Sequence, residues 1–165
     1  MRALFLEELP EGMWVLNNLR LPGLGGDIDL LVVGANGVFL LEVKTWSGAI
    51  SCAPDGRTWS RVRAGRWELL PNPAAQTQGE IRALRRYLES ADPQLCRRTQ
   101  LWIEGLIVFA HPEATVDAGY SPLPALSPQE AVEAIRAAVA RRALSPRDQE
   151  RIVELLAAVQ PALPL

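Results

Sequence analysis

The chain has 165 residues, 48% of them hydrophobic and 22% charged, and a net charge of −2, which is typical of one globular domain that needs no disulfide or metal merely to fold. Two cysteines and one histidine exclude a disulfide framework, a zinc ribbon and a multi-histidine metal site. No apolar run approaches the roughly 18–20 residues of a membrane span, and the apolar stretch at 3–6 is too short for a signal peptide, so we expect a single cytoplasmic domain over 1–165.

The first half of the chain predicts a short helix followed by strands. The expected elements are a helix over 2–9, an extended segment over 13–21, and strands over 27–33, 38–45, 47–50, 58–62 and 66–70. Pro10 ends the helix. Asn36-Gly37 is the favoured pair for a type I′ hairpin turn, and Ala64-Gly65 marks a second, more polar hairpin. The strands on either side of Asn36 are apolar on both faces, which predicts a central sheet covered on both sides.

The second half predicts helices around one further strand. The expected elements are a helix over 74–90, a buried strand over 101–110, a proline-rich connection over 111–127, and helices over 128–143 and 146–159. Ile81, Leu84 and Leu88 form one apolar stripe of the first helix. Ser127 and Ser145 each precede a proline, a typical helix start. This order of elements indicates an α/β sandwich built on a mixed sheet.

Three charged residues lie on strands that are otherwise apolar. Glu42 and Lys44 are two residues apart, so they share one face of their strand. Lys44 is the only lysine among 17 basic residues, and arginine rarely replaces a lysine whose compact ammonium is needed. Folding at the hairpin turn brings Asp29 toward the Glu42–Lys44 end of the partner strand.

Two interpretations of this cluster stay open. Two carboxylates with free oxygens suit a hard divalent cation such as Mg²⁺, and a neighbouring lysine can orient a water or stabilise phosphate charge. A structural ion pair between a carboxylate and Lys44 would give the same convergence.

The motifs resemble those of a known nuclease family. Ile28-Asp29, followed after twelve residues by Glu42-Val43-Lys44, resembles the core of the PD-(D/E)xK nuclease superfamily. The wider pattern resembles the nuclease-related domain, NERD, in the segments 26–34, 36–39, 47–48 and Asn72-Pro73-Ala74-Ala75-Gln76. The resemblance covers nearly the whole chain. It implies a restriction-endonuclease-like α/β sandwich, a central mixed β-sheet flanked by α-helices.

The resemblance also implies roles for individual residues. Asp29 and Glu42 would be metal ligands for Mg²⁺, or for Mn²⁺, with the Val43 carbonyl as a third ligand and Lys44 as the catalytic lysine. Gln76 would face the same pocket, although capping of the helix start is an equal explanation for it. Against the family pattern, the first helix is shortened and Leu30 replaces a common histidine.

Arginines cluster in the middle of the chain. Residues 57–98 contain nine arginines and four acidic residues, which suits either a solvated face or a surface for a polyanion. Arg82, Arg85 and Arg86 share one side of the predicted helix. The predicted phosphate contacts on the second hairpin are Arg61 and Arg63, with Arg57 and Arg66 beside them. Trp46 and Trp59 are candidates for base stacking, although core packing explains them better.

The sequence therefore predicts a Mg²⁺-dependent deoxyribonuclease with no membrane partner. No organic cofactor is expected, because the glycines at 23, 25 and 26 precede a strand and not a helix. The alternative is a catalytically inactive module of the same family that binds nucleic acid or a protein. The sequence does not distinguish DNA from RNA, endonuclease from exonuclease action, or one oligomeric state from another.

Overall fold

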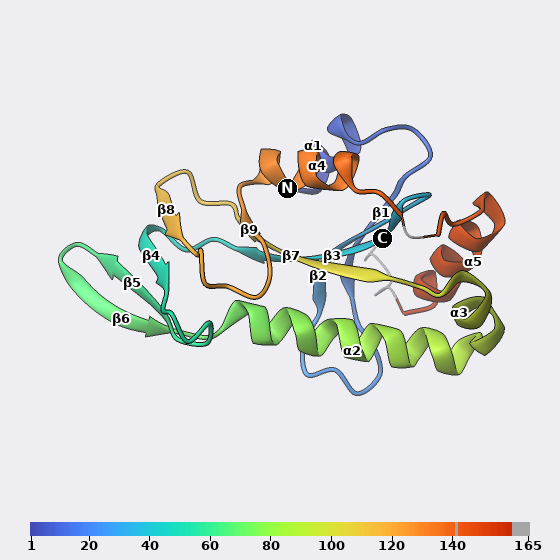
Figure 1. Cartoon of the computed structure of the whole chain (residues 1–165), viewed down its shortest axis with the longest axis horizontal. Helices are drawn as coiled ribbons and strands as arrows, with labels where there is room; N and C mark the ends of the chain where they lie inside the picture. The colour runs from blue at the N-terminus through green and yellow to red at the C-terminus, as the bar shows by residue number, and fades with distance from the viewer. Residues whose placement is uncertain (141, 160–165) are drawn as a thin grey trace, which may run out of the picture.

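The computed structural model describes residues 1–140 and 142–159, which form two sheets with helices packed on the larger one (Figure 1). In chain order the elements are α1 (Arg2–Glu8), β1 (Trp14–Leu19), β2 (Ile28–Gly34), β3 (Gly37–Lys44), β4 (Gly48–Cys52), β5 (Trp59–Arg63), β6 (Arg66–Leu70), α2 (Pro73–Ala91), α3 (Pro93–Thr99), β7 (Ile103–Phe109), β8 (Ala114–Asp117), β9 (Ala125–Leu126), α4 (Pro128–Ala137) and α5 (Pro146–Ala157). None of the helices in these ranges is both long and apolar enough to cross a bilayer.

The larger sheet is mixed, as predicted. Its strand order is β1-β2-β3-β7-β9, antiparallel from β1 to β3 and parallel from β3 to β9. Nearly every residue of β2, β3 and β7 is buried, because apolar side chains on both faces of these strands meet helices.

Each face of this sheet has its own hydrophobic core. On one face, α1 and α4 pack through Phe5 and Ile135 against Val32 of β2. On the other face, α2, α3 and α5 pack through Leu84, Leu95 and other apolar residues against β2 and β3. Figure 1 shows the long α2 helix crossing below the sheet, opposite α1 and α4. The α/β sandwich architecture is therefore confirmed.

The second sheet is a finding that the sequence did not predict. Its order is β6-β5-β4-β8, and it projects from one end of the molecule (Figure 1). After β3 and β7 the paired chains bend, and β4 then pairs in parallel with β8. Gly48 enables the bend, because its φ is +93° and a Cβ there would lie 2.6 Å from the Val62 carbonyl oxygen.

The geometry of the β2–β3 turn differs from the one that the sequence predicts. The β2–β3 hairpin is confirmed, but its predicted type I′ turn at Asn36-Gly37 is wrong. The connecting residues are Ala35 and Asn36, neither has a positive φ, and Gly37 begins β3 with a φ of +138°. The type I′ pattern of two positive φ values occurs instead at Ala64-Gly65, between β5 and β6.

The Asn36 side chain forms hydrogen bonds with the C-terminal end of α4. Its side-chain amide donates to the carbonyl oxygens of Ile135 at 2.6 Å and Ala138 at 3.4 Å. Ala138 is extended and stops the helix. The helix predicted over 128–143 therefore ends at Ala137, because the β2–β3 turn satisfies carbonyl groups at its C-terminus.

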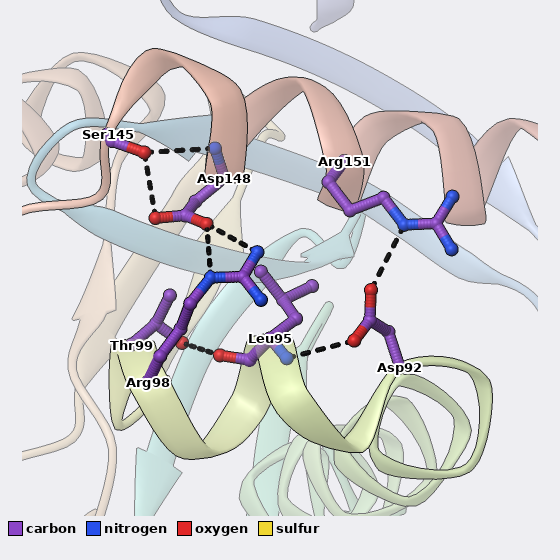
Figure 2. Close-up of polar contacts among 7 residues, drawn as sticks. All are labelled: Asp92, Leu95, Arg98, Thr99, Ser145, Asp148 and Arg151. Carbon is purple, nitrogen blue, oxygen red and sulfur yellow. Dashed lines mark hydrogen bonds and ion pairs between the residues drawn. The ribbon is translucent and has the colours of Figure 1, made fainter.

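The α3 helix was not predicted, and ion pairs attach it to α5. Asp92 caps α3 and accepts from Arg151 of α5 at 3.1 Å, while Arg98 of α3 donates to Asp148 of α5 at 2.7 Å (Figure 2). The strands β8 and β9 also lie inside the region predicted as a connection. They are four and two residues long, which is too short for a periodic pattern.

Candidate active site

The predicted acidic and basic residues meet on the α2 face of the larger sheet. The last ladder pair between β2 and β3 is Leu30–Leu41, so Asp29 and Glu42 come next on neighbouring strands. A count outward from a turn at Asn36-Gly37 brings Asp29 close to Lys44 at that end of the partner strand. The real turn shifts the register by two residues, and an even shift leaves every side chain on its predicted face.

Asp29 binds the backbone of the neighbouring strand. Its Oδ2 accepts a hydrogen bond from the Val43 amide at 2.8 Å, beyond the last ladder pair. The side chain is half-buried, and this bond satisfies only one of its two carboxylate oxygens. Asp29 is therefore fixed in position with acceptor capacity to spare.

Lys44 connects the strand residues to α2. Its ammonium pairs with Glu42 Oε1 and donates to Gln76 Oε1 at 2.9 Å. It also lies 5.2 Å from the ring centroid of Trp46, a cation–π contact. The lysine side chain is only 14% exposed, so these partners hold it in one place.

Gln76 does not cap the helix start. Asn72 does so, because its side chain accepts from the Ala75 amide at 3.0 Å. The Gln76 side chain instead accepts from Lys44 and donates through Nε2 to Glu80 Oε1 at 3.0 Å. Of the two explanations for Gln76, capping of the helix or contact with the charged cluster, the structure therefore favours the contact.

Glu42 and Glu80 are two buried carboxyl groups that interact across β3 and α2. They are 2% and 4% exposed. The Oε2 atom of each has no hydrogen-bond partner of ordinary geometry among the described residues. Burial raises the pKa of Glu42, against the lowering effect of Lys44. Burial and the nearby charge of Glu42 raise the pKa of Glu80 to about 7.

The donor set of this cluster fits a hard divalent cation. Mg²⁺ takes oxygen ligands, needs only one or two protein carboxylates and keeps several waters. Asp29 and Glu42 offer carboxylate oxygens on adjacent strands, and Glu42 Oε2 is buried without a partner in the described part of the chain. In residues 1–140 and 142–159, no group of three or more His, Cys, Asp or Glu side chains is arranged to hold a metal by itself. A cation here would therefore rely on few protein ligands.

Glu80 is the residue that sequence reasoning missed. It lies one helical turn after Gln76 and on the buried side of α2, next to the core residues Thr77 and Leu84. A charged residue on the apolar side of an amphipathic helix is the signal that could have identified it.

The predicted nucleic-acid contacts occupy different surroundings. Arg82 and Arg86 are exposed on α2, whereas Arg85 donates to the Leu101 carbonyl at 3.0 Å. On the projecting sheet, Arg61 pairs with Glu68 across the β5–β6 hairpin, and Arg63 lies directly opposite Arg66. Whether these arginines bind phosphate stays a prediction.

The two tryptophans that are candidates for base stacking both pack against Phe109. Trp59 is fully buried and stacks with Phe109 at a centroid distance of 6.1 Å. Trp46 is half-buried against the same ring. The exposed Trp67 follows Arg66 on β6 of the projecting hairpin, and it is 61% exposed. Core packing therefore explains Trp59, as the sequence favoured.

Comparison with protein families gives one result that bears on the whole cluster. A model of the nuclease-related domain, NERD, matches residues 2–110. Comparison with curated proteins and with solved structures finds no match. The matched range runs from α1 to the end of β7 and contains Asp29, Glu42, Lys44, Gln76 and Glu80.

Proposed function

The chain belongs to the nuclease-related domain family, and from this membership and the geometry of the site we propose that it is a metal-dependent nuclease that hydrolyses phosphodiester bonds of DNA. The single observation that carries the proposal is the convergence of Asp29, Glu42 and Lys44 on one face of the sheet. Each costs free energy to bury, so a purely structural sheet would not be expected to collect them.

The proposed ligands of the cation are Asp29, Glu42 and the Val43 carbonyl, with Mg²⁺ or Mn²⁺ as the ion. When bound, such a cation would stabilise negative charge on the phosphate and lower the pKa of a bound water. Within the described residues, Asp29 uses one carboxylate oxygen to accept from the Val43 amide and Glu42 Oε2 has no ordinary hydrogen-bond partner, so each side chain has an oxygen to offer a cation.

Lys44 is the proposed catalytic lysine. Its ammonium is held by Glu42 and Gln76, so it needs little reorganisation to meet an incoming phosphate oxygen or the attacking water. Glu42 and Gln76 act on the reaction partly through Lys44, because they fix the position of the charge. The low exposure of Lys44 limits its screening by solvent.

Cleavage of labelled single-stranded and double-stranded DNA with Mg²⁺ or Mn²⁺ tests the proposal. We expect Lys44→Ala and Asp29→Asn to reduce the rate by about 10²-fold or more, the usual cost of removing one group that stabilises the transition state. Asp27→Asn is the matched control. Asp27 lies two residues before Asp29 but pairs with Arg20 at 3.0 Å, so its loss should leave the rate unchanged.

The outcome separates the two functions that the sequence left open. Metal-dependent cutting that is lost in Lys44→Ala but kept in Asp27→Asn supports the nuclease. A full rate in a folded Lys44→Ala protein overturns the proposed mechanism. DNA binding without cleavage under any metal would favour the inactive nucleic-acid-binding module.

A further inference from the structure

The Glu80 carboxyl group is buried, although its contacts within the described residues do not pair both of its oxygens. Glu80 lies on the buried side of α2 and is only 4% exposed. Burying a carboxyl group is unfavourable unless a cation or a full set of hydrogen bonds compensates for it. Neither form of compensation is complete for Glu80.

In the described residues, the hydrogen bonds of the cluster pair only one of the two Glu80 carboxyl oxygens. Its Oε1 accepts from Gln76, and its Oε2 has no ordinary partner in the described residues. The only cation of the cluster, Lys44, binds Glu42 and Gln76. The nearby charges of Glu42 and Asp29 both repel an ionised Glu80. Three carboxyl groups thus lie around one ammonium, and Glu42 Oε2 and Glu80 Oε2 are left without an ordinary hydrogen-bond partner in the described residues.

A divalent cation would supply the partner that both of these oxygen atoms lack. Glu42 Oε2 and Glu80 Oε2 are both buried and both lack ordinary partners, and they belong to carboxyl groups that interact directly. Oxygen atoms of this kind are the ligands that Mg²⁺ and Mn²⁺ prefer.

We propose that Glu80 is a further metal-binding carboxylate of this site, which joins α2 to β3 through the same divalent cation that Glu42 binds. The inference rests on the proposed function, because it gives the cation proposed at Glu42 of β3 a carboxylate partner from α2. It predicts that the cation also stabilises the packing of α2 on the sheet. The consequence can be measured without any substrate.

Binding of Mn²⁺ and Mg²⁺ by the whole chain, measured by isothermal titration calorimetry and by the shift in Tm, is the direct test. We expect Glu80→Gln to weaken Mn²⁺ binding by about tenfold or more and to lose most of the rise in Tm that Mn²⁺ causes in the wild type. Glu89→Gln, which neutralises an exposed residue of the same helix, should match the wild type in both measurements.

Each outcome decides one question. If the wild type binds Mn²⁺ and Glu80→Gln binds it equally well, the role of Glu80 is overturned while the proposed function stands. If the wild type itself binds neither ion at millimolar concentration, the proposed function fails, and the role of Glu80 fails with it. If Glu80→Gln does not fold, Glu80→Asp replaces it. A wild-type affinity in that variant, whose carboxylate is one methylene shorter, would also overturn the inference.

Discussion

Gly105 shows how a single residue positions α2 over the site. A Cβ at this position on β7 would lie 2.8 Å from Thr77 Cγ2 and 2.8 Å from Ile81 Cδ1, which are both on α2. These two residues are adjacent to Gln76 and Glu80, so the close approach of the helix also sets the position of the polar cluster. The absence of a side chain at Gly105 is therefore part of the site's geometry.

We predict that Gly105→Ala destabilises the protein by about 1–3 kcal/mol, the usual cost of an extra methyl group in a packed core. The displaced helix should also weaken Mn²⁺ binding. Urea denaturation measures the first effect and calorimetry the second. The matched control is Gly119→Ala, since nothing lies within 4 Å of a Cβ there. Equal stability of the two variants would show that α2 adjusts freely and would contradict this explanation.

At the scale of elements, the turn of the β5–β6 hairpin holds an alanine in a strained backbone conformation that a substitution can relieve. Ala64 has a φ of +49° and Gly65 a φ of +71°, as a type I′ turn requires. An alanine in the left-handed region costs roughly 1–2 kcal/mol, and asparagine tolerates that region better. We expect Ala64→Asn to raise the free energy of unfolding by about 0.5–1 kcal/mol. Gly65→Ala should lower it. If both variants changed stability in the same direction, the turn would not be the cause.

Elements with strong local signals could be predicted, and those defined by distant partners could not. Ser127 and Ser145 each cap a helix in the structure, as predicted, because a serine followed by proline is a local signal for a helix start. In contrast, β8 exists only because it pairs with β4 after the bend, about 65 residues away in the chain. No pattern within four residues encodes such a pairing.

The same distinction applies to the site. The common face of Asp29, Glu42 and Lys44 follows from strand alternation and the parity of the β2–β3 register, and the error in the turn shifted that register by an even number of residues. The position of Glu80 depends on which side of α2 contacts β3, and this is a property of tertiary packing. The sequence therefore predicted the strand part of the site and Gln76 of α2, and it missed Glu80.

For the molecule as a whole, the α3–α5 ion pairs predict a response to acid (Figure 2). The Leu95 amide and Arg151 lower the pKa of Asp92 from its usual 3.8. Burial opposes the change at Asp148, but hydrogen bonds from Ser145 and Arg98 still lower its pKa. A carboxyl group with a lowered pKa stabilises the folded state above its unfolded pKa, and this stabilisation is lost as the pH falls through the folded value.

We therefore expect a protein with Asp92→Asn and Asp148→Asn to have a lower Tm than the wild type at neutral pH. The difference should shrink as the pH falls below 3.8, since the wild-type carboxyl groups then become neutral too. Asparagine still caps a helix, so the comparison isolates the charge. Thermal unfolding followed by circular dichroism across the acid range is the measurement. A Tm difference that stayed constant down to about pH 2 would show that the pairs act through packing and not through ionisation.

The distribution of arginines over the molecule leads to the last prediction. Arg63 and Arg66 lie opposite one another at the tip of the projecting hairpin, and neither pairs with a carboxylate among the described residues. Like charges on directly opposite strand positions destabilise a hairpin. A phosphate backbone would turn this cost into binding free energy, because each neutralised phosphate releases counterions.

We expect Arg63→Ala with Arg66→Ala to reduce the slope of log K against log salt for DNA binding by up to about 2, since each phosphate contact contributes roughly 0.7–0.9. Arg82→Ala with Arg86→Ala should have a similar effect if α2 also faces DNA, whereas Arg85→Ala should chiefly lower stability, because its guanidinium binds the Leu101 carbonyl. The control is Arg97→Ala with Arg147→Ala, which removes the same charge from α3 and α5, at the end of the molecule away from the hairpin (Figure 1). If all these double variants reduced the slope equally, the DNA would be responding to net charge alone. If only Arg63→Ala with Arg66→Ala reduced the slope of log K against log salt, the result would indicate that the nucleic acid contacts the β5–β6 hairpin.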